Sequence, residues 1–198
     1  MASPASSNVA GLLLAAGAGR RFGLPKALVE LNGEPFLLHA LRTLTDGGCA
    51  PVRVVLGARV DEARTLLPDP DLAVYAPDWA EGMGASLRTG LAALAALTPA
   101  PDAVLVQLVD LPDVDARIVA RVAAQADGPD VVARATYHGR YGHPALFGRR
   151  WWSEIEASAT GDRGARAWLS GRGDIRLVEC ADLGEGTDVD TPADLPHA

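Results

Sequence analysis

The chain has 198 residues, of which 48% are hydrophobic and 22% are charged, and its net charge is −7. This length is enough for one domain with a sizeable core, and the composition is that of an ordinary globular protein. The negative charge argues against nucleic acid as a partner. No apolar run reaches the length of a membrane span, so we do not expect a membrane as a partner either.

The first eight residues differ from the rest of the chain in composition. Residues 1–8 lack the basic and apolar regions of a signal peptide and are predicted to be a disordered tail. Residues 9–198 are predicted to form a single domain. Cys49 and Cys180 lie too far apart in sequence for metal-ligand spacing, which favours reduced thiols and a cytoplasmic location.

Apolar runs and helical spacings alternate along the chain. We expect strands at 9–16, 52–56, 72–75, 103–109, 130–135 and 175–178. We expect helices at 34–46, 61–67, 87–97, 115–126, 149–157 and 164–169, and a polar loop at 137–143. This order predicts an α/β, Rossmann-like three-layer sandwich, with a mostly parallel sheet and helices on both faces. Ligands of such sheets bind at the carboxyl ends of the strands.

A glycine-rich, basic loop follows the first predicted strand. Gly17, Gly19 and Gly23 let the backbone curl closely around a ligand, and Arg20, Arg21 and Lys26 add positive charge. Such a loop can hold a polyphosphate. An ordinary strand-to-helix turn with solvated arginines is the structural alternative.

The start of this loop is also similar to a dinucleotide-binding turn. That turn requires Gly-x-Gly-x-x-Gly running directly into a helix. Here Gly23 comes one residue late, and Pro25 stands where the helix should continue. A dinucleotide-dependent oxidoreductase is therefore the least favoured function.

Two acidic segments are candidate metal ligands. Asp110 directly follows a predicted buried strand, and Mg²⁺ is commonly bound by one or two carboxylates together with phosphate oxygens. Asp188 and Asp190 alternate in a second segment, so an extended backbone points both the same way. A strand-end turn at Asp110 and a helix start at Asp190 are the structural alternatives. We interpret Asp113 as part of a solvated turn and Asp115 as a helix cap.

The segment 81–87 precedes a predicted helix. Ser86 is a candidate N-cap there on composition alone. Trp151, Trp152 and Trp168 lie in helical stretches and are predicted to pack in the core or at an interface.

Several of these motifs together resemble one family. The run Leu14-Ala15-Ala16-Gly17-x-Gly19-x-Arg21-Phe22-Gly23-x-x-Lys26 is similar to the triphosphate-binding loop of the MobA-like nucleotidyltransferases, and most similar to their molybdenum cofactor cytidylyltransferase type. Asp110-Leu111-Pro112 resembles the Asp-x-Pro motif of the family, and residues 188–195 resemble its closing motif. The family often has serine at the position of Gly19. The resemblance extends from Val9 to Leu195.

The resemblance implies a nucleotide-diphospho-sugar transferase-like fold and a set of site residues. It implies catalytic roles for Arg21, Lys26 and Asp110. It implies nucleotide-binding roles for Leu14, Ala15, Ala16, Gly17, Gly19, Arg20, Gly23, Gly82 and Ser86. It implies Asp110 and Asp190 as ligands of Mg²⁺, with Mn²⁺ as an alternative and Asp188 as a weaker candidate ligand. It implies acceptor-binding roles for Gly142, His143 and Pro144, although a lone loop histidine is commonly just solvated. Residues 161–166 also resemble a family segment on the acceptor side of the site.

The activity implied by the resemblance is transfer of CMP from CTP to molybdopterin, with release of pyrophosphate. In this family, members that transfer a cytidine nucleotide have Ala-Ala-Gly at the start of the loop, and members that transfer a guanosine nucleotide have Ala-Gly-Gly. The resemblance of Ala15-Ala16-Gly17 to the first pattern therefore favours CTP over GTP. Alternatives are guanylyl transfer with GTP, a phosphosugar or phospholactate acceptor, and a non-catalytic nucleotide- or cofactor-binding chaperone. A molybdoenzyme or a cofactor-insertion protein is a candidate partner.

Overall fold

A computed structural model describes residues 8–195 of the chain. The predicted tail, residues 1–7, lies outside the described residues. Asn8, which we expected to end that tail, is hydrogen-bonded to the body of the protein: its backbone N–H donates to Asp102 Oδ2 at 3.1 Å, and its carbonyl accepts from Asp102 N at 3.0 Å. Asn8 is therefore held against the body of the protein, and the division into a tail and a single domain stays a prediction.

The elements alternate much as the sequence predicts. The strands are β1 (Val9–Ala15), β2 (Glu30–Leu31), β3 (Glu34–Pro35), β4 (Val52–Leu56), β5 (Ala73–Tyr75), β6 (Ala103–Leu108), β7 (Val132–Tyr137), β8 (Arg140–Gly148) and β9 (Arg176–Glu179). The α-helices are α1 (Phe36–Asp46), α2 (Val60–Leu66), α3 (Met83–Ala95), α4 (Ala116–Ala123), α5 (Trp152–Ser158) and α6 (Arg166–Leu169). Short 3₁₀ turns are η1 (Lys26–Leu28), η2 (Pro70–Leu72), η3 (Trp79–Glu81), η4 (Arg149–Trp151), η5 (Gly161–Arg163) and η6 (Pro192–Asp194).

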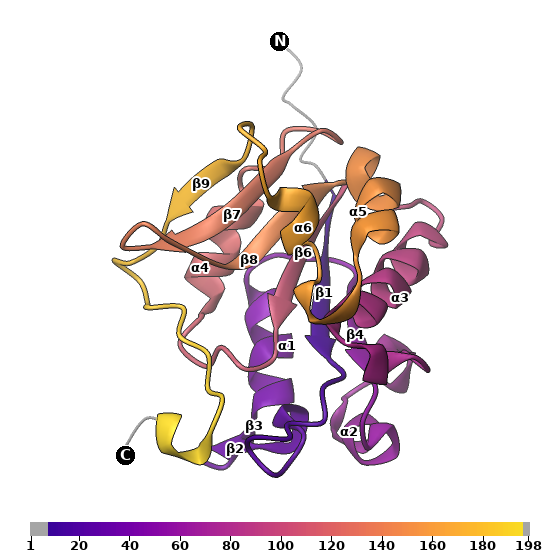
Figure 1. The fold of residues 1–198 in the computed structure, drawn as a ribbon, viewed down its shortest axis with the longest axis vertical. Helices are drawn as coiled ribbons and strands as arrows, with labels where there is room; N and C mark the ends of the chain where they lie inside the picture. The colour runs from indigo at the N-terminus through magenta and orange to yellow at the C-terminus, as the bar shows by residue number, and fades with distance from the viewer. Residues whose placement is uncertain (1–7, 196–198) are drawn as a thin grey trace.

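Seven strands form one twisted sheet in the order β5-β4-β1-β6-β8-β7-β9. All neighbouring pairs are parallel except those that involve β8, which runs antiparallel to both β6 and β7. Helices α1 and α4 cover one face, and α3 and α5 cover the other (Figure 1). The expected three-layer, mostly parallel fold is confirmed.

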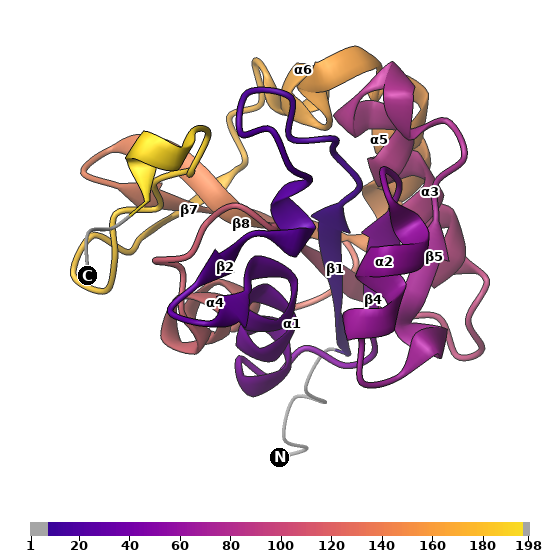
Figure 2. The ribbon, with the colours of Figure 1, turned by 90° about the horizontal axis from the view of Figure 1, so that it is seen from below.

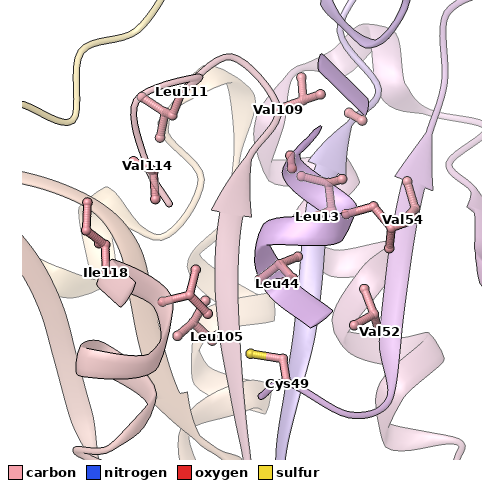
Figure 3. Close-up of a cluster of buried hydrophobic side chains, with 14 of the residues drawn as sticks. Leu13, Leu44, Cys49, Val52, Val54, Leu105, Val109, Leu111, Val114 and Ile118 are labelled. Atoms are coloured by element: carbon pink, nitrogen blue, oxygen red, sulfur yellow. The ribbon is translucent and has the colours of Figure 1, made fainter. Parts of the chain in front are cut away.

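The central strand β1 is buried at every position, since it has a neighbour on each side and helices on both faces. Its alternate side chains divide between two cores. Leu13 packs under α1 and α4 with Leu44, Leu105 and Ile118 (Figure 3), while Leu12 and Leu14 pack under α3. No helix within residues 8–195 has the length and apolar character needed to cross a membrane.

Three strands were not predicted: the short pair β2 and β3, whose Glu34–Pro35 had been expected to start a helix that in fact begins at Phe36, and the long strand β8. The expected polar loop at 137–143 is a tight hairpin in which His138 and Gly139 both have positive φ, 51° and 76°, and lead directly into β8. Pro144 lies in the middle of β8, directly before its apolar residues 145–147, and a proline at such a position argues against a strand when only the sequence is considered. Tertiary pairing with β6 and β7 nevertheless forms the strand.

The start of helix α4 agrees with the prediction, whereas the start of helix α3 does not. Asp115 caps α4 as expected, because its side chain accepts hydrogen bonds from Arg117 N and Ile118 N. Helix α3 starts earlier than expected, at Met83, with Gly82 as its N-cap residue. Ser86 is therefore already inside the helix and does not cap it.

Candidate active site

The loop after β1 is shaped around Gly19. This residue has φ +60°, and a Cβ there would overlap the carbonyl of Leu24, so only glycine fits. The serine often found here in the resembled family does not suit this backbone. Phe22 N and Gly23 N donate to the Gly19 carbonyl, at 2.9 and 2.8 Å. Between residues 17 and 21, no backbone N–H donates to another group of the described chain, which leaves these donors for an anion.

Lys26 begins η1 at the end of this loop and joins two carboxylates. Its Nζ lies 2.6 Å from Asp110 Oδ2 and 2.6 Å from Asp190 Oδ1. The Lys26 side chain is 15% exposed, so this contact is shielded from water. Arg21 Nη1 lies 2.8 Å from the other oxygen of Asp190, with an exposed side chain. Two cations of the loop thus face two carboxylates from distant parts of the chain.

The C-terminal segment, residues 185–190, is held next to the end of β6 by hydrogen bonds. Val189 N donates to the carbonyl of Asp110 at 2.9 Å, and Asp113 Oδ2 accepts from Glu185 N at 2.9 Å and Thr187 N at 3.3 Å. Asp113 lies in a turn as we interpreted it, but it is half-buried and its carboxylate anchors this segment instead of being solvated. Seen from the end at which β1 finishes, the N-terminal loop and the C-terminal segment lie at the same end of the sheet (Figure 2).

This anchoring places the two acidic candidates of the segment in different surroundings. Asp190 contacts Lys26 and Arg21, whereas Asp188 is exposed and does not line the cavity at the site. The 3₁₀ turn η6 follows directly, and Asp194 Oδ2 accepts from Thr191 N at 2.7 Å. The helix start that we weighed as an alternative for Asp190 therefore lies directly after it.

The contacts between Lys26 and the two carboxylates determine which of these groups carry a charge. Burial by itself lowers the pKa of Lys26, but hydrogen bonds to Asp110 and Asp190 and their charges outweigh burial and raise this pKa above its usual value. The hydrogen bond from Lys26 holds the pKa of Asp190 below its usual range, although burial opposes this effect. Lys26 and Asp190 are therefore both charged at neutral pH.

A cavity of about 430 Å³ opens over this loop. Nearly all the residues predicted for the nucleotide and for catalysis line it. These residues are Leu14, Ala16, Gly17, Gly19, Arg20, Arg21, Lys26, Gly82, Ser86, Asp110 and Asp190. Ser86 is 4% exposed and belongs to the first turns of α3, so its place in the wall comes from the helix.

Five predicted site residues do not line this cavity. The side chain of Ala15 belongs to the core under α1, because alternate residues of β1 point to opposite faces. Gly23 closes the turn of the loop and lies outside the cavity wall. The three residues predicted for the acceptor, Gly142, His143 and Pro144, lie on β8. His143 is half-buried, contrary to the solvated alternative, and burial together with Arg134 and Arg166 lowers its pKa to about 4.

The cavity wall also contains residues that sequence reasoning missed. These residues are Ala18, Trp79, Ala80, Glu81, Met83, Leu108, Val109 and Asp162. Glu81 and Met83 belong to the segment 81–87 that we had singled out, and Trp79 lies two residues before it, so this segment was a usable signal. Asp162 belongs to η5, in the segment 161–166 that resembles the acceptor side of the family's site, and the packing of η5 against α3 brings it to the cavity.

The site fits a divalent cation in part. Asp110 Oδ1 is buried and has no hydrogen-bond partner in the described chain. Within residues 8–195 there is no group of three or more His, Cys, Asp or Glu side chains that could enclose a metal ion. Two carboxylates alone leave most of the coordination to ligand oxygens and water, which is how Mg²⁺ is usually bound with a nucleotide. The residues present therefore fit a cation that arrives with phosphate.

Comparison with known proteins relates this site to a family. Residues 11–178 match the MobA-like NTP transferase domain. A protein of Paenarthrobacter nicotinovorans named nicotine blue oxidoreductase is 36% identical over 194 residues, which cover 92% of each chain. A protein of Burkholderia lata named molybdenum cofactor guanylyltransferase is 32% identical over 188 residues, covering 86% of this chain and 85% of that one.

Solved structures give the same fold. The crystal structure of a Mycobacterium tuberculosis rv0371c homolog from Mycobacterium sp. strain JC1 superposes with a TM-score of 0.79 at 28% identity, covering 94% of this chain and 92% of that one. Rv0371C from Mycobacterium tuberculosis H37Rv, solved as a complex with manganese, gives a TM-score of 0.72 at 24% identity, covering 96% and 94%.

Proposed function

The chain belongs to the MobA-like NTP transferase family and is a nucleotidyltransferase of that type, and from its site we propose that it transfers CMP from CTP to the phosphate of molybdopterin. The observation that carries this proposal is the contact of Lys26 with both Asp110 and Asp190 beneath a glycine loop with free N–H groups. This arrangement combines an anion-binding loop with two carboxylates suited to a cation.

The protein's part in this reaction is positioning and charge neutralisation. The N–H groups of residues 17–21 bind triphosphate oxygens, and Arg21 and Lys26 neutralise the charge that develops on them. Asp110 and Asp190 would hold Mg²⁺ or Mn²⁺, which draws charge from the phosphate oxygens when it is bound. The acceptor phosphate is already ionised near neutral pH, so its attack on the α-phosphorus, with departure of pyrophosphate, needs no general base.

The choice of base depends on Ala16 in this proposal. Its methyl group is 4% exposed and belongs to the cavity wall, where it reduces the room for a purine. GTP is the competing substrate, because one relative of nearly the same length is named a molybdenum cofactor guanylyltransferase. Direct competition of the two triphosphates decides between them.

The test is release of pyrophosphate by the purified chain with molybdopterin and either Mg²⁺ or Mn²⁺. We expect turnover with CTP that exceeds turnover with GTP, UTP and ATP, and loss of turnover in Asp110→Asn. A phosphosugar and phospholactate replace molybdopterin in parallel reactions, since the same site could serve another phosphorylated acceptor. Tight nucleotide binding without turnover on any acceptor would instead support a nucleotide- or cofactor-binding chaperone.

A second candidate function is suggested by the relative named nicotine blue oxidoreductase, which is 36% identical over nearly the whole chain. An oxidoreductase on this fold would use the cavity for a redox dinucleotide and would not need the pair Asp110 and Asp190. Oxidation of NADH or NADPH in the presence of nicotine blue, unchanged in Asp110→Asn, would favour this function. We favour the transferase because the structure retains both carboxylates in contact with Lys26.

Two further proposals concern the surroundings of the protein. We place it in the cytoplasm, because Cys49 and Cys180 are both free and buried. A molybdoenzyme or a cofactor-insertion protein is the partner that would receive the product. This proposal is tested by loading the purified chain with product and measuring whether it then co-purifies with such an acceptor protein.

A further inference from the structure

A second cavity, of about 610 Å³, opens between α1, the turn 49–52 and the segment 68–72 that joins α2 to β5. It shares no residue with the cavity over the glycine loop and is the larger of the two. Helices α1 and α2 lie next to each other on the same face of the sheet (Figure 2). The proposed nucleotidyl transfer makes no use of this second cavity, which therefore needs an explanation of its own.

The wall of the second cavity is mainly apolar. Cys49, Leu41 and Val52 are buried there, and the other apolar residues of the wall are half-buried or exposed. A volume of roughly 300–1,000 Å³ with an apolar wall and a few polar groups is typical of sites for small molecules. A ligand would cover this edge of the core and remove apolar surface from water. The apolar residues used in this argument are Leu38, Leu41, Cys49, Pro51, Val52 and Leu72.

The charges in this wall are not balanced. Glu34 and Arg42 neutralise each other, since Arg42 Nη2 lies 2.6 Å from Glu34 Oε2. The wall has two further carboxylates, Asp46 and Asp69, and no second basic residue. Neither carboxylate forms an ion pair within residues 8–195. Asp69 accepts one hydrogen bond, from the backbone N–H of Asp71 at 2.9 Å.

The position of Asp46 adds to this excess of negative charge. Asp46 is the last residue of α1, and the last turn of this helix has no basic residue. The carboxyl end of a helix carries partial negative charge, so it favours cations and disfavours a carboxylate. The helix end and the carboxylates of Asp46 and Asp69 would therefore all attract a positive group that enters the cavity.

These features restrict the kind of ligand that fits the cavity. An anion would meet two unpaired carboxylates, and a neutral apolar molecule would leave them unpaired. A divalent metal ion needs several oxygen ligands, and the described part of the chain has no group of three or more His, Cys, Asp or Glu side chains that could hold one. An organic cation with an apolar body uses both the apolar wall and the charge.

We propose that this second cavity binds a small organic cation, of the class of aryl or branched alkyl ammonium ions. The apolar body packs against Leu41, Val52 and Leu72, and the ammonium group lies at the carboxylates of Asp46 and Asp69. This site is separate from the one proposed for nucleotidyl transfer, and the inference does not depend on that function.

The probe that tests the charge is para-trifluoromethyl-benzylamine, a cation at neutral pH, whose binding is followed by ¹⁹F NMR. Its neutral isostere, para-trifluoromethyl-benzyl alcohol, has the same apolar body. We expect saturable binding of the amine, at least about tenfold tighter than binding of the alcohol, because only the amine gains the charge contacts.

Removal of the two carboxylates should affect the amine alone. In the double variant Asp46→Asn with Asp69→Asn, the amine should bind about tenfold more weakly, and the affinity for the alcohol should be unchanged. Asparagine at position 69 keeps an oxygen that can accept from Asp71 N. Asp61→Asn is the matched control, because Asp61 is exposed on α2 and does not line the cavity.

A pair of tryptophan variants tests where the amine binds. Thr45 is exposed in the cavity wall, and its hydroxyl donates only to the Leu41 carbonyl of its own helix, so Thr45→Trp should fold normally and obstruct the cavity. Thr65 donates in the same way to the Glu62 carbonyl on α2 but does not line the cavity. We expect Thr45→Trp to lose binding of the amine and Thr65→Trp to retain it.

Four results would each overturn the proposal. These are the lack of saturable binding of the amine, equal affinities for amine and alcohol, undiminished binding of the amine in the double variant, and undiminished binding in Thr45→Trp. The measurements use neither a triphosphate nor turnover. They therefore decide whether this site exists even if the chain transfers no nucleotide.

Discussion

The Lys26 ammonium lies 2.6 Å from Asp110 Oδ2, although 84 positions separate the two residues in the chain. The same nitrogen contacts Asp190, which is 164 positions away. In the chain without ligands, the lysine neutralises the carboxylates that we propose as cation ligands. A divalent cation and Lys26 therefore compete for Asp110 and Asp190, and triphosphate oxygens offer the lysine alternative partners.

Replacing this lysine should expose the competition. In Lys26→Met the two carboxylates lose their shared cation, and we expect the free energy of unfolding to fall by about 1–3 kcal/mol. Saturating Mn²⁺ should then raise Tm more in the variant than in the wild type, as measured by thermal unfolding with and without the metal. Arg21→Met is the control, because the exposed Arg21–Asp190 pair contributes little to stability. An equal effect of Mn²⁺ on wild type and Lys26→Met would contradict the competition.

The two acidic residues of the C-terminal segment should differ in their effect on metal affinity. Asp190→Asn removes a carboxylate that faces Asp110, so binding of Mn²⁺ in the presence of CTP should weaken by about tenfold or more. Asp188→Asn changes an exposed residue away from the cavity and should leave the affinity unchanged. Electron paramagnetic resonance of free Mn²⁺ measures both affinities. The opposite order of effects would make Asp188 the ligand.

Nucleotide preference should respond to one methyl group. Ala16→Gly enlarges the cavity, and if this methyl limits the room for a purine, kcat/KM for GTP should rise about tenfold relative to CTP. The ratio of the two values within one preparation is insensitive to losses of active protein. Ala18→Gly also removes a methyl from the wall of the cavity and serves as the control. An unchanged ratio in Ala16→Gly would remove the physical basis for the preference.

The thiol of Cys49 should make stability depend on pH in alkaline solution. Burial raises the pKa of Cys49 to about 12, whereas a thiol in an unfolded chain titrates near pH ~8.5. Between these values only the unfolded chain loses the proton, so the free energy of unfolding falls by up to about 1.4 kcal/mol per pH unit as pH rises. Urea unfolding at a series of pH values should show a shallower decline in Cys49→Ala. Parallel pH profiles for the two proteins would show that Cys49 does not contribute.

His143 should remain neutral down to acidic pH. Its pKa is lowered to about 4, while an unfolded histidine titrates near pH ~6.5. Only the unfolded chain takes up this proton between these values, so His143 reduces stability as pH falls through that range. A pH titration by NMR, with the signal assigned through His143→Gln, should give a midpoint near 4. A midpoint near 6.5 would show that the surrounding charges and burial have little effect.

The sequence determined the fold class and most of the loop. Strands β1 and β6 are short apolar runs buried on both sides, and Asp115 is a capping residue directly before an amphipathic helix. The glycines at 17 and 19 indicate a loop at the end of a strand, and this prediction does not depend on distant parts of the chain. These features depend on neighbouring residues, which is why patterns in the sequence are sufficient to predict them.

The tertiary structure decided the parts that depend on distant residues. It placed Asp190 and not Asp188 against Lys26, gave the turn residue Asp113 an anchoring role, and formed β8 despite Pro144. Contacts of this kind follow from strand order and register, which place residues side by side whatever their separation in the chain.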